Sequence, residues 1–168
     1  MSPIPSERTH KWDLRFLREA ALASTCSKDP STQCGAKIVD PDNRVVSSGF
    51  NGFPRGVEDS PDRLINREFK LRGIIHAELN AILFAQRPLQ GHTIYTWPLP
   101  PCGLCAAVIV QVGIRRVVVP GNVPKDKLER WALDFQVAEK WFLEGQVEVT
   151  VLDAVIDPAW LVPDACCA

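Results

Sequence analysis

The sequence has no excess of charge of either sign and no long apolar run. It has 19 lysines and arginines against 20 aspartates and glutamates, a formal net charge of -1. Proteins that hold a long phosphate backbone usually carry a basic surface, so this balance argues against a nucleic acid partner. No apolar run approaches the roughly 20 residues that cross a membrane, and the N-terminal segment lacks the apolar core of a signal peptide. We therefore expect a cytoplasmic protein with no membrane partner.

The chain also lacks internal repeats and low-complexity segments. Its 168 residues suggest one domain, and its 46% of hydrophobic residues is ordinary for a chain that folds around a core. We expect a single domain over residues 1–168, with a core at about 11–152. The remainder, about 153–168, contains Pro158 and Pro163 and is expected to be an irregular tail.

Cysteine is present six times, but a reducing compartment argues against disulfide bonds. The cysteines are then thiols or metal ligands. Cys26 and Cys34 have no histidine nearby in the sequence, and we interpret them as buried thiols. The pattern leaves open the roles of Cys26, Cys34, Cys166 and Cys167.

Hydrophobic periodicity and turn residues predict one helix, a hairpin of two strands, and then alternating helices and strands. This order favours a layered α/β fold. We expect a three-layer α/β/α arrangement, in which a five-stranded mixed sheet carries helices on both faces. The predicted helices cover 11–24, 62–71, 75–86, 102–112 and 126–144, and the strands cover 36–40, 44–50, 92–97, 115–120 and 146–152.

Three side chains in two predicted helices suggest a metal site. The apolar segment "IIHAELNAILFA" contains His76 and Glu78 near its start, and both are costly to bury. The segment "PPCGLC" supplies Cys102 and Cys105, which share a helix face in a first turn that favours thiolates. Two helix N-termini on neighbouring crossovers would bring His76 and the two cysteines together. Three nitrogen and sulfur ligands with one open position are typical of a catalytic zinc site.

The spacing H-x-E followed by P-C-x-x-C is the signature of zinc-dependent nucleobase deaminases. Here it reads His76-Ala77-Glu78 and Pro101-Cys102-Gly103-Leu104-Cys105. One Zn²⁺ per chain would lower the pKa of a bound water from about 16 to about 7, and Glu78 would carry protons between that water and the base. A lone Cys-x-x-Cys could instead be a redox pair or half of a zinc knuckle, and a lone histidine could be a helix cap. The joint pattern favours zinc.

Four stretches together resemble the deoxycytidylate (dCMP) deaminases of the zinc-dependent cytidine deaminase superfamily. The resemblance covers about residues 20–120 and implies a cytidine-deaminase-like fold, hydrolysis of dCMP to dUMP and ammonia, a small-molecule nucleotide substrate and a homo-oligomer. It makes His76, Cys102 and Cys105 the zinc ligands and Glu78 the catalytic proton shuttle. The stretches are "SKDPSTQCGAKIV", "SSGFNGFPRG", "HAELNAILFA" and "PPCGLCAAVIVQVGIRRVVV".

The same resemblance implies four substrate contacts. Asn51 would lie near the sugar hydroxyl, the backbone around Ala77 would face the pyrimidine, and Pro101, beside the first cysteine, is a further candidate contact. Arg55 suits a phosphate contact because a guanidinium can bind phosphate through two hydrogen bonds. A solvated loop residue is the alternative for Arg55.

Several other side chains have less specific interpretations. Arg67, Lys70 and Arg72 could meet phosphate or a neighbouring subunit, but we interpret them as a solvated helix face. Trp97 follows the strand that leads to the cysteines and is a candidate for the pocket wall. Trp131 lies in the long predicted helix 126–144, where it would pack on the sheet or form a subunit contact.

Three other functions remain as alternatives. The substrate could be another free or modified cytosine nucleoside or nucleotide, because loop shape decides the choice. A tRNA adenosine deaminase should need a basic surface, which the composition does not provide. An inert zinc-binding module would be expected to lose Glu78, which is present. The sequence leaves open the exact substrate, the number of subunits and any control by dCTP or dTTP.

Overall fold

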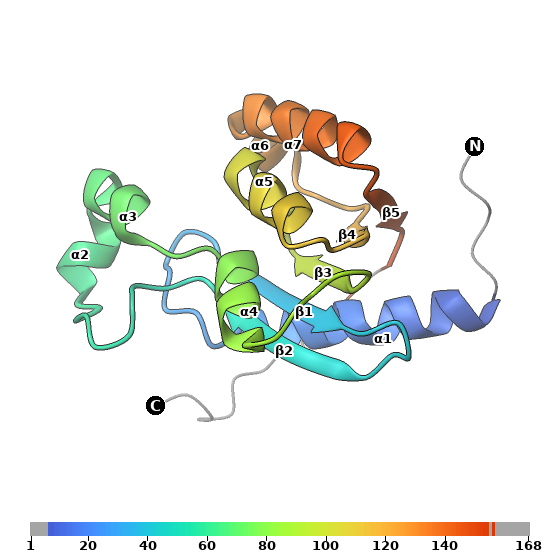
Figure 1. Ribbon diagram of the computed structural model, residues 1–168. Coiled ribbons are helices and arrows are strands. Elements are labelled where there is room, and N and C mark those ends of the chain that lie inside the picture. The colour runs from blue at the N-terminus through green and yellow to red at the C-terminus, as the bar shows by residue number, and fades with distance from the viewer. Residues whose placement is uncertain (1–6, 155, 157–168) are drawn as a thin grey trace.

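The computed structural model describes residues 7–154 and residue 156 (Figure 1). The predicted C-terminal tail lies outside this range except for Asp153, Ala154 and Ile156, and Cys166 and Cys167 lie outside it as well. No helix in the described part of the chain combines the length and the apolar character needed to cross a membrane.

The described residues form helices and strands in nearly the predicted order. The helices are α1 (Glu7–Ser24), α2 (Pro61–Ile65), α3 (Arg67–Gly73), α4 (Ala77–Ala85), α5 (Gly103–Gln111), α6 (Lys125–Arg130) and α7 (Ala132–Glu144). The strands are β1 (Gly35–Val39), β2 (Val45–Phe50), β3 (Thr93–Trp97), β4 (Arg116–Pro120) and β5 (Glu148–Leu152).

The five strands form one mixed sheet in the order β2-β1-β3-β4-β5. β1 pairs with both β2 and β3 in antiparallel fashion, whereas β3, β4 and β5 run parallel to one another. Strand β4 has four consecutive buried residues and one partly buried residue, as expected for a central strand covered on both faces. The predicted mixed sheet is confirmed.

Helices cover both faces of this sheet, which confirms the three-layer α/β/α prediction. On one face, α1 packs Phe16 and Leu17 against Val118 and other residues of the sheet. On the other face, α4, α5 and α7 enclose a second core that includes Ile109 and Phe142. Figure 1 shows α1 along one side of the sheet and α5 and α7 on the opposite side.

Two predicted helices are each divided in two. Residues 62–71 were expected to form one helix, but α2 ends and α3 begins at Asn66, whose side-chain oxygen accepts a hydrogen bond from Phe69 N at 3.1 Å. Such a cap satisfies one of the free amides at a helix start, so Asn66 favours a new helix. The predicted helix 126–144 is interrupted at Trp131, whose φ of -110° and ψ of 16° depart from helical values.

The α2–α3 segment stands away from the sheet and returns to it just before α4 (Figure 1). The return is fixed by an isolated bridge, in which Ile75 N donates to Gly52 O at 2.8 Å and Gly52 N donates to Ile75 O at 3.1 Å. This bridge ties the loop after β2 to the start of α4, and so it sets the position of His76.

Candidate active site

The three predicted metal ligands lie together where α4 and α5 begin. His76 is the residue before α4, and Cys102 is the residue before α5. The Sγ atoms of Cys102 and Cys105 each lie 3.4 Å from His76 Nδ1, and all three ligand atoms lie within 4.8 Å of one another. Ligands bonded to a tetrahedral zinc at about 2.0–2.3 Å stand roughly 3.4–3.8 Å apart. The cluster therefore fits a zinc ion.

The donor set also fits the role expected of the ion. Among the described residues, the cluster consists of one imidazole and two thiols. Structural zinc sites normally have four protein ligands, whereas catalytic sites have three and leave one position for water or substrate. Because Cys102 caps α5 and Cys105 lies in its first turn, with both Sγ atoms 3.4 Å from His76 Nδ1, the two cysteines can bind one ion together.

The three side chains of the cluster shift one another's pKa values. Hydrogen bonding with Cys105, and then with His76, lowers the pKa of Cys102 to about 4. Hydrogen bonding with Cys102 raises the pKa of His76 to about 9 against the effect of burial. The pKa of Cys105 is raised by hydrogen bonding with Cys102 and by burial. Without a metal, Cys102 is thus the thiolate and His76 and Cys105 keep their protons; a metal ion would have to displace these two protons, because a metal needs its ligands deprotonated.

Glu78 lies in the first turn of α4, two residues after His76. Its side chain is buried, with 7% of the residue exposed. Burial raises the pKa of Glu78, and the charge of His76 acts in the opposite direction. Glu78 is not part of the three-residue ligand cluster. A buried carboxyl beside a metal site can hold and release a proton near neutral pH, as general acid–base catalysis requires.

A cavity of about 520 Å³ opens over this cluster. Its wall includes His76, Glu78 and Cys102, together with two residues that the sequence predicted as substrate contacts, Asn51 and Ala77. A cavity of this size is typical of small-molecule sites. Trp97 lines it as expected. Trp131, which was expected to pack on the sheet or form a subunit contact, lines it as well.

The structure does not bring the other two predicted contacts into the cavity wall. Arg55 is exposed, and its guanidinium lies 5.4 Å from the ring centroid of Phe84, outside the lining residues. Pro101 is buried beside Cys102, and its neighbour Pro100 lines the cavity in its place. The loop that carries Arg55 turns towards α4, so the phosphate contact inferred from resemblance has no support in this geometry.

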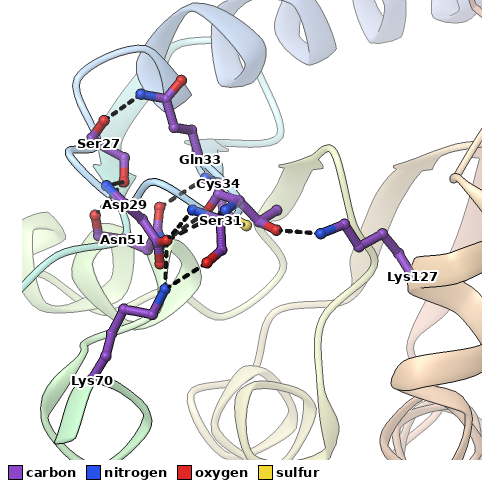
Figure 2. A network of polar contacts seen from close by, with 9 residues as sticks. Ser27, Asp29, Ser31, Gln33, Cys34, Asn51, Lys70 and Lys127 are labelled. Carbon is purple, nitrogen blue, oxygen red and sulfur yellow. Dashed lines mark hydrogen bonds and ion pairs between the residues drawn. The ribbon is translucent and has the colours of Figure 1, made fainter. Parts of the chain in front are cut away.

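A network of polar contacts holds the loop before β1 against the cavity (Figure 2). Asp29 Oδ1 accepts hydrogen bonds from Lys70 Nζ and from Ser31 N, both at 2.7 Å. Asn51 Oδ1 accepts from Cys34 N at 2.8 Å, and Asn51 Nδ2 donates to Asp29 Oδ2 at 3.3 Å. The network fixes Asn51 and the loop as one unit in the wall.

Two expectations about this region were wrong. Lys70 was expected on a solvated helix face, but only 5% of it is exposed, because Asp29 draws its ammonium inward. Cys26 and Cys34 were expected to be buried thiols, and both are only half-buried. Cys34 lines the cavity over the cluster and Cys26 lines a second cavity of about 260 Å³, which accounts for their partial exposure.

Comparisons with known proteins agree with this geometry. A family model described as the cytidine and deoxycytidylate deaminase zinc-binding region matches residues 10–120. An uncharacterized deaminase in the luxG 3′ region of Aliivibrio fischeri is 48% identical over 142 residues, which cover 84% of this chain and 94% of that protein. The deoxycytidylate deaminase of Homo sapiens is 38% identical over 128 residues, covering 73% of this chain and 71% of the human protein.

A solved structure supports the fold independently of close sequence similarity. The dCMP deaminase of the cyanophage S-TIM5, in complex with dCMP and dUMP, matches with a TM-score of 0.65. The match covers 88% of this chain and 99% of that chain at 21% identity. The sheet and its two layers of helices are therefore shared with that structure.

Proposed function

Because the chain belongs to the cytidine and deoxycytidylate deaminase family, whose zinc-binding region spans residues 10–120, we propose that it hydrolyses dCMP to dUMP and ammonia. One observation carries this proposal. A His-Cys-Cys cluster and a buried glutamate lie together in the wall of a cavity of about 520 Å³. The human relative, named deoxycytidylate deaminase, supports dCMP as the substrate.

The side chains divide into ligands and a proton carrier. His76, Cys102 and Cys105 would hold one zinc ion per chain, and a bound zinc ion lowers the pKa of a water molecule to about 7. The Glu78 carboxylate would take one proton from this water and deliver it to ring nitrogen N3 as the water oxygen bonds to C4 of the pyrimidine. Glu78 would then take the remaining proton from the new hydroxyl on C4 and give it to the amino group, so that the C4–N bond breaks and ammonia leaves while the C4 carbonyl of dUMP forms.

Two further residues position the base and the sugar. Asn51 lines the cavity with its amide held by Asp29 and Cys34 N, which supports a contact with the sugar hydroxyl. Ala77 lines the cavity between His76 and Glu78, which supports a backbone contact with the pyrimidine. We infer from the sequence resemblance that the chain is a single deaminase domain and acts as a homo-oligomer in the cytoplasm.

The test is ammonia release from dCMP, deoxycytidine, CMP and 5-methyl-dCMP by the zinc-loaded protein. We expect dCMP to be turned over well above deoxycytidine. Glu78→Gln is the matched control: it should keep stoichiometric zinc by metal analysis and lose about 10²–10⁴-fold in turnover. A zinc-loaded wild-type protein that releases no ammonia from any of the four compounds would contradict the proposed function.

A further inference from the structure

Two arginines line the cavity without a partner of their own. Arg67 belongs to α3 and Arg130 is the last residue of α6, and both guanidinium groups are solvent-accessible. Within residues 7–154 and 156, neither side chain has an ion pair or a hydrogen bond. Arg72, on the same helix as Arg67, pairs with Glu68 at 3.2 Å. The two cavity arginines are therefore cations available to a ligand.

Each arginine shares a helix face with a lysine that is fixed to the same loop. Lys70 lies three residues after Arg67, and its Nζ is bonded to Asp29 Oδ1 at 2.7 Å and to Ser31 Oγ at 3.0 Å. Lys127 lies three residues before Arg130, and its Nζ donates to Thr32 Oγ1 at 2.9 Å. Residues three apart on a helix lie on the same side of it.

The two helices approach the loop from opposite sides. Figure 2 shows Lys70 and Lys127 reaching the segment from Asp29 to Cys34 from either side. Because each arginine is one helical turn from its lysine and lines the same cavity, Arg67 and Arg130 flank that segment at the cavity wall.

The nearby carboxylates do not neutralise these arginines. Of the two carboxylates that line the cavity with them, Asp29 is already paired with Lys70, and Glu78 is buried beside His76. The side chains of the wall include three cations, Arg67, Lys70 and Arg130, against the two carboxyl groups of Asp29 and Glu78. Planar guanidinium groups can each donate two hydrogen bonds to one phosphate, which makes arginine the preferred residue for such a contact.

We propose that Arg67 and Arg130 together bind the 5′-phosphate of the nucleotide whose base enters the cavity towards Glu78. This inference rests on the proposed function for the identity of the base. The pair takes the role that the sequence assigned to Arg55, which lies outside the cavity wall. Lys70 and Lys127 are positioning residues, because they hold the two helices against the loop.

The test compares equilibrium binding of dUMP and deoxyuridine by calorimetry, so that it does not depend on turnover. We expect the wild-type protein to bind dUMP more tightly than deoxyuridine. Arg67→Gln and Arg130→Gln should each weaken dUMP binding by about 10- to 100-fold, the effect of losing hydrogen bonds to a charged group, and leave deoxyuridine binding unchanged. Arg130→Lys should recover part of the loss, because it keeps the charge without the paired donors.

Lys125→Gln is the matched control. Lys125 is an exposed cation at the start of α6 that does not line the cavity, and its loss should leave both affinities unchanged. Equal affinity of the wild-type protein for dUMP and deoxyuridine would overturn the inference, as would variants that lose affinity for both compounds equally. Phosphate-dependent binding without ammonia release would instead sustain the arginine pair and count against the proposed function.

Discussion

Lys70 and Asp29 form an ion pair that is almost completely removed from solvent. The exposed fractions of the two side chains are 6% and 7%. Removing one partner of a buried pair leaves the other charge unpaired and costs about 3–5 kcal/mol. Lys70→Met should therefore lower the free energy of unfolding by about 3 kcal/mol in urea denaturation. Arg72→Met is the control, because it breaks a pair with exposed fractions of 79% and 81% and should cost at most about 1 kcal/mol. Equal losses in the two variants would contradict the assignment.

Some functional side chains could be identified from the sequence and others could not. His76, Cys102 and Cys105 could be identified because their chemistry is uncommon and their spacing is fixed by two helix starts. Lys70 could not, because its partner Asp29 lies 41 residues away and an isolated lysine is usually solvated. Arg130 gave no signal either, since nothing in its neighbours along the chain indicates that it lines the cavity.

At the scale of elements, β2 and α4 approach each other closely at Gly49. A Cβ atom there would collide with backbone atoms of Ala77 and Ala81. Gly49→Ala should therefore push α4 away from the sheet, together with His76 at its start, and cost about 1–3 kcal/mol of stability. We also expect weaker zinc binding in competition with a chromophoric chelator.

Gly52→Ala is the control, because no heavy atom lies within 4 Å of the added Cβ. Unchanged zinc affinity in Gly49→Ala would show that the position of α4 is not limiting.

The sequence predicted the sheet and its layers because each element has a clear period and clear breaks. It did not predict the interruption between α6 and α7, because neither glycine nor proline marks it. The hydrogen bonds from Trp131 N to Lys127 O, at 3.1 Å, and from Phe135 N to Trp131 O, at 3.0 Å, continue through the break. The backbone dihedral angles of Trp131 depart from helical values, and Trp131 and Phe135 line the cavity. The boundary therefore carries no glycine or proline in the sequence, and it lies where the chain borders the cavity.

At the scale of the whole molecule, zinc should add stability to a fold that can form without it. Each face of the sheet has its own hydrophobic core, whereas the metal cluster joins only the starts of α4 and α5. A ligand present at about a thousand times its Kd stabilises the folded state by about 4 kcal/mol, which for a chain of this size is about 10 °C in Tm.

Removing zinc with a chelator should therefore lower the Tm by about 10 °C, while the far-ultraviolet circular dichroism at 25 °C stays unchanged. Cys102→Ala supplies the comparison: it should melt near the temperature of the zinc-free wild-type protein, and the chelator should not shift it further. Collapse of the circular dichroism on zinc removal would mean that the two cores cannot sustain the fold alone. An unchanged Tm after complete removal, verified by metal analysis, would mean that the ion does not couple α4 to α5.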